Sequence, residues 1–373
     1  MSTMRRHILF LATEYDAPGM HPYAINIINT MWQVGDRVVI VTRHGPEPDA
    51  FPEIPEDCIT WIDYPQSKLQ RLWFRYFPKR LHHAIDQVLE TSEVSLIYSL
   101  TGELVLAPTI RRLQTRVPVL YTVHDAVYHD YKFISPVEWL KDRLIIALPQ
   151  QRLFKYAVNM VTNSLEQRDA ILSRFPYHKV SYAPFPTLVN DTIARGGTPV
   201  PELASVQDGY ILFFGTLHLY KGVHLLYEAH QTHPELREVP LVIAGTKDIY
   251  FERRADENNV FFINRFISDS EVKDLFSRAG VVVYPYISAT QSGVVSIASY
   301  FDKPMVVSNL PFFRQTCEGF EGIESFPPND TQSLAAAITR SLKSSASTRR
   351  LYDSQYDPEV LHSALTTILQ STN

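Results

Sequence analysis

The residues best suited to chemistry lie in a short glycine-flanked segment, residues 215–222, in the second half of the chain. The segment follows an apolar run at 211–214 and ends in the pair Lys221-Gly222, where a helical pattern begins. A lysine between a strand and a helix lies beside backbone N–H groups and the positive end of the helix dipole, a good position for binding phosphate. The sequence therefore makes Lys221 a candidate anion ligand, and the alternative is an exposed lysine on an ordinary loop.

A second segment of this kind, residues 288–294, follows the apolar run at 281–286. It consists largely of small and hydroxyl-bearing residues and leads directly into a helical pattern. Such a turn presents N–H groups and hydroxyls at a helix start, and the alternative is a simple helix N-cap. Two anion-ready strand ends in one domain suit a diphosphate. The candidate ligands in this segment are Thr290, Gln291, Ser292, Gly293 and Val294.

A histidine in the first half of the chain is the third candidate. His124 directly follows the apolar run at 117–123, which reads as a strand. At a strand end it could bond a sugar hydroxyl or donate to a developing negative charge. The alternative is a histidine whose ring nitrogens are satisfied by the local backbone.

Several well-known ligand-binding patterns are absent from the sequence, and their absence excludes certain classes of binding site. Neither G-x-x-x-x-G-K-[ST] nor G-x-G-x-x-G occurs, so there is no P-loop and no dinucleotide fingerprint. The absence of Asp-x-Asp weighs against a transferase that holds its diphosphate through a divalent metal. Neither H-E-x-x-H nor C-x-x-C occurs, which weighs against zinc. We therefore expect a site that uses neither a metal nor a cofactor.

The elements that must position these residues follow from the spacing of apolar runs. Runs that are apolar on both faces alternate with helical patterns along the chain, as in covered parallel sheets. The expected strands of the first half are 7–13, 37–42, 58–62, 95–100, 117–123, 160–162 and 180–184, with helices at 23–32, 81–89 and 165–173. Those of the second half are 210–215, 240–245, 260–266, 280–286 and 305–308, with helices at 222–232, 271–279, 293–301 and 331–342.

This alternation occurs twice, which predicts an α/β fold of two domains with mainly parallel sheets. Residues 187–208 interrupt it with two glycines and two prolines and are expected to form a linker. We expect an N-terminal domain at 1–190, a C-terminal domain at 209–345, and a C-terminal segment, 346–373, that packs back on the N-terminal domain. Ligands in such sheets bind at the carboxyl ends of the strands, so the two domains are expected to face each other across a cleft.

Composition limits the partners and the compartment. The chain has 373 residues and a formal net charge of −5, which makes a nucleic acid an unlikely partner. Its two cysteines, Cys58 and Cys317, form no disulfide framework and fit a reducing compartment. The apolar run after the N-terminus is too short for a signal peptide, and no stretch approaches the roughly 18 apolar residues of a membrane span. These features predict a cytoplasmic protein.

One stretch, residues 68–83, has a composition that suits a membrane surface. It interleaves basic and aromatic residues and contains no acidic residue, as expected where anionic lipids are contacted. The contact residues would be Lys68, Arg71, Trp73, Arg75, Lys79 and Arg80. The alternative is a solvated helix whose aromatic side chains belong to the core. On the first interpretation, the protein makes peripheral contact with the inner face of the membrane.

Taken together, these segments resemble the retaining glycosyltransferases of family 4, which have the GT-B fold of two Rossmann-like domains. Residues 35–38 with the following Val-Thr resemble the family's second strand, and 123–125 resemble its cleft histidine segment. Residues 215–222 resemble its diphosphate loop, and 265–293 resemble the stretch from its nucleotide-base strand to its phosphate turn. The resemblance spans most of the chain, and its order and spacing are more specific than any single motif.

The resemblance implies transfer of a hexose from a nucleotide diphosphate sugar to a glycan or lipid-linked glycan, with anomeric retention, in polysaccharide biosynthesis. UDP is favoured as the commonest donor nucleotide. Lys221 and the 290–294 segment would stabilise the leaving diphosphate, with a weaker contact from Thr216, and His124 would contact the sugar. The base and ribose would lie near Gly245, Arg265 and Phe266, and the cleft loop of the N-terminal domain would contain Gly19.

The sequence also departs from the family. The arginine position of the first loop holds Thr216, and Gly19 is followed by Met20 in place of a second glycine. The family's paired glutamates are absent in both registers that the flanking residues allow. Two alternatives therefore stay open. One is a nucleotide-sugar epimerase of the same architecture, and the other is a non-catalytic partner that binds a nucleotide sugar or a glycan.

Overall fold

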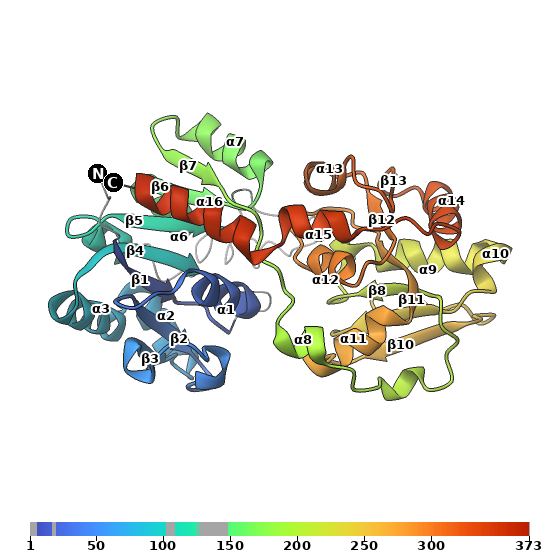
Figure 1. Ribbon diagram of the computed structural model, residues 1–373, viewed down its shortest axis with the longest axis horizontal. Coiled ribbons are helices and arrows are strands. Elements are labelled where there is room, and N and C mark those ends of the chain that lie inside the picture. Colours follow the sequence, from blue (N-terminus) through green and yellow to red (C-terminus); the bar gives the residue numbers. More distant parts are fainter. Residues whose placement is uncertain (1–5, 17–19, 102–108, 125, 127–147, 373) are drawn as a thin grey trace. The chain divides into compact units, whose positions relative to one another are not determined.

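The structure is a computed structural model of the chain, and it describes residues 6–16, 20–101, 109–124, 126 and 148–372. The chain forms two compact units. Unit 1 comprises Met1–Pro186 and Pro358–Asn373, and unit 2 comprises Thr187–Asp357. The chain therefore leaves unit 1 once and returns to it with its last helix (Figure 1).

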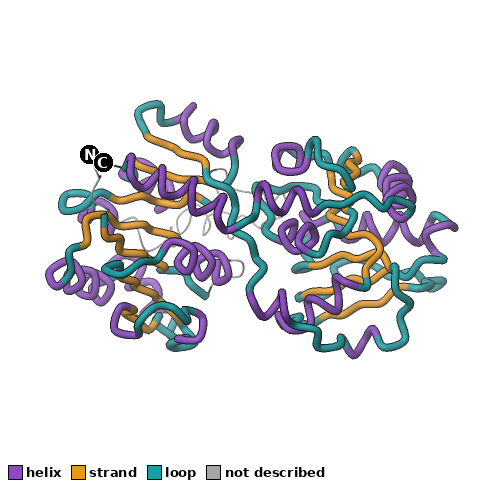
Figure 2. The backbone as a smooth tube through the Cα atoms, in the orientation of Figure 1, coloured by secondary structure: helices purple, strands orange, loops and turns teal. Residues whose placement is uncertain are grey.

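Unit 1 is built on a seven-stranded sheet in the order β3-β2-β1-β4-β5-β6-β7, and all neighbouring strands are parallel. The central strands are buried along nearly their whole length, because helices lie on the faces of the sheet (Figure 2). The strands are β1 (His7–Ala12), β2 (Arg37–Thr42), β3 (Ile59–Asp63), β4 (Val94–Thr101), β5 (Val119–Val123), β6 (Asn159–Thr162) and β7 (Lys179–Tyr182).

The helices of unit 1 bury apolar residues at helical spacing. In α3, for example, Leu81, Ile85 and Val88 recur every three or four residues and are all buried in the core of the unit. The last helix packs beside the first, and the Arg6 guanidinium donates to the Thr372 carbonyl, which ties the two ends of the unit together. The helices are α1 (Met20–Met31), α2 (Lys68–Tyr76), α3 (Lys79–Thr91), α6 (Leu148–Tyr156), α7 (Leu165–Arg174) and α16 (Pro358–Ser371).

Unit 2 is built on a six-stranded sheet in the order β10-β9-β8-β11-β12-β13, again with parallel neighbours throughout. The strands are β8 (Tyr210–Phe214), β9 (Leu241–Gly245), β10 (Val260–Asn264), β11 (Ala279–Tyr284), β12 (Met305–Ser308) and β13 (Ile323–Phe326). Its helices are α8 (Asp191–Arg195), α9 (Val223–Thr232), α10 (Pro234–Arg237), α11 (Asp269–Ser277), α12 (Val294–Tyr300), α13 (Pro311–Cys317), α14 (Thr331–Leu342) and α15 (Arg349–Gln355). The predicted fold class, α/β with two mainly parallel sheets, is confirmed.

The segment 187–208, which the sequence suggests as a linker, is packed on unit 2. Helix α8 lies beside α11, and the Asn190 side-chain amide donates to the Asp269 carboxylate at 2.6 Å. The backbone N–H groups of Gly197 and Thr198 both donate to the Ser270 carbonyl at 2.9 Å. Glycines and prolines interrupt the strand and helix patterns here, but the segment still forms ordered contacts with one unit.

In each sheet there is one point at which the chain stops adding strands on one side and continues on the other. In unit 2 the chain proceeds outward from β8 to β9 and β10, and then returns to the other side of β8 with β11. The carboxyl ends of the neighbouring strands β8 and β11 therefore form the switch point, where ligands bind in open α/β sheets. The loops that follow these two strands lie at this point. In unit 1 the corresponding neighbours are β1 and β4.

A glycine lets the segment after β8 approach the end of β11 closely. Gly222 adopts a left-handed conformation, with φ of 64°, and a Cβ atom at this position would lie 1.9 Å from the Pro285 carbonyl oxygen. No side chain fits at that distance, and left-handed backbone is itself costly for residues other than glycine. Gly222 is thus required for the geometry of the switch point in unit 2.

We expect Gly222→Ala to destabilise the protein more than Gly209→Ala does. Gly209 also has a positive φ, 88°, but a Cβ atom there would meet nothing within 4 Å. Its variant carries only the penalty of left-handed backbone, about 1–2 kcal/mol, whereas Gly222→Ala adds the clash with Pro285. Urea unfolding of both variants measures the difference. Equal losses of stability would contradict the close contact.

Candidate functional site

The loops that follow β8 and β11 are joined by hydrogen bonds at the switch point of unit 2. The Tyr220 carbonyl accepts from the backbone N–H of Ile287 at 2.7 Å and from that of Ser288 at 3.3 Å. The preceding residues of the β8 loop are held from the other side, where the Leu217 N–H donates to the Thr246 carbonyl at 2.9 Å. The segment 215–222 is therefore fixed between the ends of β9 and β11.

Lys221 lies at the centre of this arrangement and is held by a tyrosine, which is itself hydrogen-bonded to a serine. Its ammonium group donates to the Tyr286 hydroxyl at 2.6 Å, and it lies 4.1 Å from the centre of the Tyr286 ring. The Tyr286 hydroxyl is in turn 3.1 Å from the Ser292 hydroxyl. Two of the predicted ligands, Lys221 and Ser292, are thus brought together from the two loops by a tyrosine that the sequence analysis did not single out.

Burial lowers the pKa of Lys221 to about 8, because the charged form loses hydration in this environment. The nearby Tyr220 hydroxyl acts in the opposite direction, but its effect is smaller. Within the part of the chain that the structure describes, no ion pair joins Lys221 to a carboxylate. A partly buried cation held only by neutral groups is suited to receive an anion from solution.

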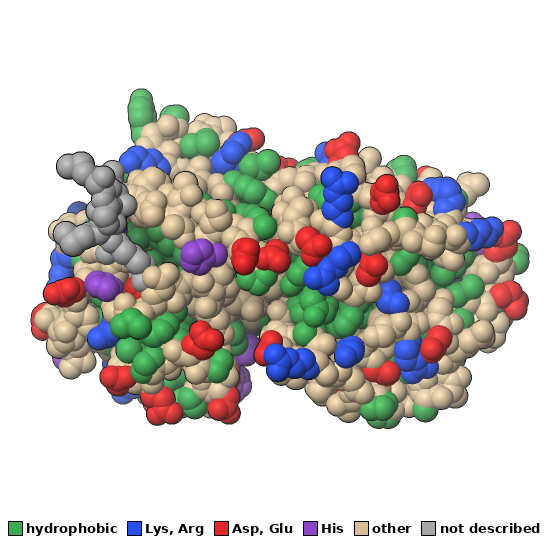
Figure 3. All heavy atoms as spheres, viewed as in Figure 1, with side chains coloured by type: hydrophobic (Ala, Val, Ile, Leu, Met, Phe, Trp, Pro, Cys, Tyr) green, Lys and Arg blue, Asp and Glu red, His purple; other side chains and the backbone are tan. Residues whose placement is uncertain are grey.

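Many arginines of unit 2 differ from Lys221, because they have carboxylate partners. On the face shown in Figure 3, basic and acidic side chains are interspersed over this unit. Ion pairs join Arg278 to Asp208, Arg340 to Glu324 and Arg349 to Asp353, at 2.6 to 2.9 Å. In such pairs the carboxylate neutralises the charge of the arginine, whereas the charge of Lys221 is not neutralised in this way.

The 288–294 turn contributes its residues unequally. Ser292 is buried and faces Tyr286, while Gly293 precedes the first residue of α12 and its carbonyl accepts from the Ser296 hydroxyl at 2.6 Å. The Tyr284 hydroxyl donates to the Val294 carbonyl at 2.9 Å, which fixes the start of the helix against β11. Thr290 and Gln291 are half-buried in the same turn. Helix α12 is short, so its dipole is a weaker contribution than the sequence analysis assumed.

Thr216 and Gly245 lie on the β9 side of the β8 loop. The Thr246 hydroxyl is 3.4 Å from that of Thr216. A Cβ atom at Gly245 would lie 1.9 Å from the Gly215 carbonyl oxygen, so only glycine allows this approach of β9 to the β8 loop. Thr216 thus belongs to the loop that carries Lys221 and Gly245 lies against it, and their role toward a nucleotide stays a prediction.

Arg265 and Phe266, the two other residues assigned to base and ribose, lie at the end of β10. The Arg265 guanidinium is paired at 2.7 Å with Glu202 and at 2.7 Å with Glu271. Hydrogen bonding to Arg265 lowers the pKa of Glu271 to about 2, with help from Ser268 and against the effect of burial. Arg265 thus ties the 187–208 segment to α11, whereas the Phe266 side chain is 73% exposed.

Two of the predicted site residues, Gly19 and His124, belong to unit 1. Gly19 lies outside the described residues. His124 directly follows β5 and is 7% exposed, and its Nε2 is 2.7 Å from the Leu100 carbonyl oxygen. Its ring also packs edge-on against Tyr23, with centroids 4.7 Å apart. The ring thus has a backbone partner, which comes from the neighbouring strand β4 and not from the local backbone, and a role toward sugar stays a prediction.

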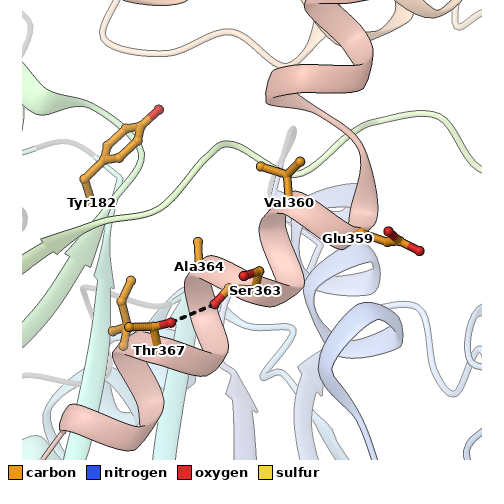
Figure 4. A pocket seen from close by; sticks show the side chains of 7 residues that line it. Tyr182, Glu359, Val360, Ser363, Ala364 and Thr367 are labelled. Atoms are coloured by element: carbon orange, nitrogen blue, oxygen red, sulfur yellow. Dashed lines mark hydrogen bonds between the residues drawn. The ribbon is translucent and has the colours of Figure 1, made fainter.

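A separate hollow in unit 1 does not involve any predicted site residue. It has a volume of about 650 Å³ and lies between β7 and α16 (Figure 4). Its lining is Tyr182, Glu359, Val360, Ser363, Ala364, Thr367 and Ile368.

In the described ranges, no three His, Cys, Asp or Glu side chains gather as metal ligands would, and no helix is long and apolar enough to cross a membrane. Metal-independent binding stays a prediction.

Comparison with known families and proteins gives a family match within unit 2. Residues 208–344 match the family described as Glycosyl transferases group 1. O-antigen chain mannosyltransferase C of Escherichia coli is 28% identical to this chain over 145 residues, which are 36% of this chain and 37% of that protein. The chain thus spans well under half the length of this relative. Both Lys221 and Ser292 fall within the region that matches the family.

Solved structures resemble the whole chain. Anabaena HepE in complex with UDP has a TM-score of 0.69 at 17% identity, and the match covers 98% of this chain and 100% of that one. Sucrose-phosphate synthase of Thermosynechococcus elongatus has a TM-score of 0.65 at 18% identity, covering 98% and 93%. An E. coli trehalose-6-phosphate structure bound with UDP-2-fluoro glucose has a TM-score of 0.68 at 12% identity, covering 98% and 99%. The fold is therefore the GT-B fold of these proteins.

We expect Lys221→Met to stabilise the ligand-free protein at neutral pH, because it removes a buried charge that has no counter-ion. The folded pKa of about 8 lies below the ordinary value of 10.5, so from pH 8 to 10.5 the unfolded chain binds more protons than the native state. Wild-type stability therefore rises with pH across this window, and the advantage of the variant shrinks. Urea unfolding at pH 7 and pH 10 measures both effects.

The matched control is Lys155→Met, which removes an exposed lysine of α6. Its stability relative to wild type should be the same at both pH values. An advantage of Lys221→Met that is equally large at pH 7 and pH 10 would show that the effect comes from the added apolar surface and not from the charge.

Proposed function

We propose that the protein is a retaining, metal-independent glycosyltransferase that moves a hexose from a nucleotide diphosphate sugar to a glycan or lipid-linked glycan. The observation that carries the proposal is the Lys221–Tyr286–Ser292 cluster at the switch point of unit 2. It presents a partly buried cation without a counter-charge, in the region that matches glycosyl transferases group 1. A polysaccharide product and a cytoplasmic location belong to the same proposal.

The chemistry requires stabilisation of a leaving diphosphate, whose negative charge grows as the bond to the sugar breaks. Lys221 is mostly protonated at neutral pH, since its pKa of about 8 lies above 7, and a bound phosphate would raise that pKa further. The Ser292 and Thr290 hydroxyls and the first N–H groups of α12 add neutral donors. Groups that are already oriented before the reaction stabilise the transition state without reorganisation.

UDP is the proposed nucleotide. HepE was solved with UDP and with UDP-glucose, and the E. coli trehalose-6-phosphate structure was solved with UDP-2-fluoro glucose. The exposed Phe266 ring at the end of β10 offers an apolar face for a base, and Gly245 leaves room beside the β8 loop. With Arg265 neutralised by two glutamates, its proposed role changes from ribose contact to support of this edge.

The absent paired glutamates favour a second candidate function, a non-catalytic protein that binds the nucleotide sugar. Retention needs no carboxylate base if the leaving phosphate itself accepts the proton of the acceptor hydroxyl. Product analysis separates the candidates. A glycosyltransferase yields a new glycosidic bond, an epimerase yields an isomerised sugar, and a binding protein yields neither.

We also propose that α2 docks the protein on an anionic membrane. Four apolar side chains of this helix, at positions 69, 72, 73 and 76, share one face and are 45–74% exposed. Phe77, just beyond the helix, is 58% exposed and packs against Trp73. Of the aromatic residues in this stretch, only Phe74 belongs to the core. An exposed apolar stripe of this kind suits insertion at the boundary of lipid headgroups.

The charges around the stripe favour anionic lipid. Lys68, Lys79 and Arg80 are exposed, and residues 64–85 contain no acidic residue. Arg71 is less available than the sequence analysis assumed, because its Nε donates to the Pro65 carbonyl at 3.0 Å. Each free basic residue near an anionic surface contributes about 1 kcal/mol, so binding should be salt-sensitive. Pro78 separates α2 from α3, so the basic stretch is two helices and not one.

For the glycosyltransferase proposal, we expect UDP to bind with the same affinity in EDTA and in magnesium, as measured by calorimetry.

A thermal-shift screen of nucleotide sugars should identify the donor, since a ligand at 100 times its Kd stabilises a protein by about 2.7 kcal/mol. With that donor, Lys221→Ala should lower turnover by roughly 10²–10³, the scale of losing one charge-stabilising donor.

The control is Lys343→Ala, a lysine at the end of α14 that should leave binding and turnover unchanged. An absolute requirement for magnesium in UDP binding would overturn the metal-independent site. Wild-type turnover in Lys221→Ala would remove this residue from the reaction.

For the membrane proposal, we expect co-sedimentation with vesicles that contain phosphatidylserine and none with pure phosphatidylcholine. Binding should weaken in high salt and in Lys79→Glu/Arg80→Glu, which reverses two exposed charges. It should also be lost in Leu69→Ser/Trp73→Ser, which interrupts the apolar stripe.

A matched control is Val34→Ser/Tyr177→Ser. These side chains of unit 1 are 83% and 94% exposed, so the variant removes comparable apolar area at other positions. It should bind anionic vesicles as wild type does. If no variant differs from wild type, or if wild type ignores anionic vesicles at low salt, α2 is an ordinary solvated helix.

A further inference from the structure

Lys247, in the loop after β9, has a backbone conformation that is unusual for a lysine. Its φ is 75°, in the left-handed region. Three other non-glycine residues in the described ranges share this feature, and they are Asn259, Asp302 and Asn329, which are types that tolerate it. A lysine gains nothing locally from this conformation. Backbone strain of this kind persists where the surrounding structure imposes it, and it is often associated with function.

The side chain of Lys247 is fixed toward the β8 loop. Its Nζ is 2.8 Å from His218 Nε2, and the β8 and β9 loops are also joined by the hydrogen bond from Leu217 N–H to the Thr246 carbonyl. An ammonium group can only donate, so His218 Nε2 is the acceptor and its ring is neutral. The His218 ring in turn stacks on Tyr220, with an interplanar angle of 26° and centroids 5.5 Å apart.

Two cations act on this one histidine. The pKa of His218 is lowered by burial and then by the charges of Lys247 and Lys221. Lys247 is thus hydrogen-bonded to the loop that carries Lys221, and the two lysines come from the joined loops after β9 and β8. Within the described residues neither lysine has an ion pair. Each lysine is hydrogen-bonded to one neutral group and keeps donors free for an anion.

We propose that Lys247, positioned by His218, is a second cation of the donor site, so that the two lysines together select a diphosphate over a monophosphate. The inference rests on the proposed function, because it assigns a further ligand to the same site. One ammonium group is enough for one phosphate. Two that come from neighbouring loops match two linked phosphates, and the hydrogen bond to His218 holds the Lys247 side chain on the loop that carries the first lysine. Thr216, on the same loop as His218, supplies no charge.

The test compares the affinities of UDP and UMP, measured by calorimetry in EDTA, for wild type and Lys247→Asn. Asparagine adopts left-handed backbone readily, so the variant removes the charge while the loop conformation is retained. We expect the Kd for UDP to rise by about tenfold and the Kd for UMP to change much less. Lys247→Arg should recover most of the UDP affinity, and Lys343→Asn should bind both nucleotides as wild type does.

The positioning role of His218 has its own pair of variants. His218→Gln keeps an acceptor for the ammonium group and should bind UDP nearly as wild type does, while His218→Leu should lose affinity as Lys247→Asn does. Thermal unfolding of each ligand-free variant shows whether the fold is retained.

Three outcomes are distinguishable. If wild type binds no UDP, the proposed function itself fails. If wild type binds UDP and Lys247→Asn binds it equally well, only the role of Lys247 is overturned. Equal losses of UDP and UMP affinity, or a loss that accompanies unfolding and that Lys247→Arg shares, would also overturn it.

Discussion

The contact between the β8 loop and the end of β11 is the constraint on which the rest of the candidate site depends. The Tyr220 carbonyl accepts from two N–H groups of the β11 loop, and Gly222 fits against Pro285 only because it has no side chain. This contact fixes the direction in which Lys221 leaves the loop. Tyr286 and Ser292 then follow as its neighbours from the other strand. Any change that separates the two loops would disperse these groups before it affected the sheet itself.

The same constraint explains why a cation is tolerated here without a carboxylate. A buried carboxylate would neutralise Lys221 more completely, but it would also compete with a phosphate ligand. Neutral hydroxyl partners orient the ammonium group and leave its charge uncompensated, at some cost in stability. Arg265 shows the opposite arrangement in the same unit, since Glu202 and Glu271 satisfy it and it serves to hold segments together. The difference between a binding cation and a structural one lies in their partners.

Much of the fold could be predicted from sequence, because strands buried on both faces appear as short apolar runs. β2 and β12 coincide with predicted runs, whereas β13 was missed because it lies at the sheet edge and two polar residues interrupt its apolar ones. Lys221 was predictable from its place between a strand and a glycine. The partners of Arg265 and His124 were not, because Glu202 and Leu100 are distant in sequence and only the packed fold brings them near. Lys247 gives no sequence signal, since its importance comes from its backbone conformation.

The two switch points differ in chemistry, and this difference bears on how the units divide their tasks. In unit 2 the strand ends carry two unpaired lysines. In unit 1 the Thr13 hydroxyl donates to the Thr101 carbonyl, and the Thr101 hydroxyl accepts from the Glu14 N–H. The carboxylates of Asp16 and Glu47 lie on the neighbouring loops. Carboxylates repel phosphate, and together with hydroxyls they suit a neutral ligand rich in hydroxyl groups. This charge asymmetry arises on two sheets of similar topology, and it agrees with the nucleotide site proposed for unit 2.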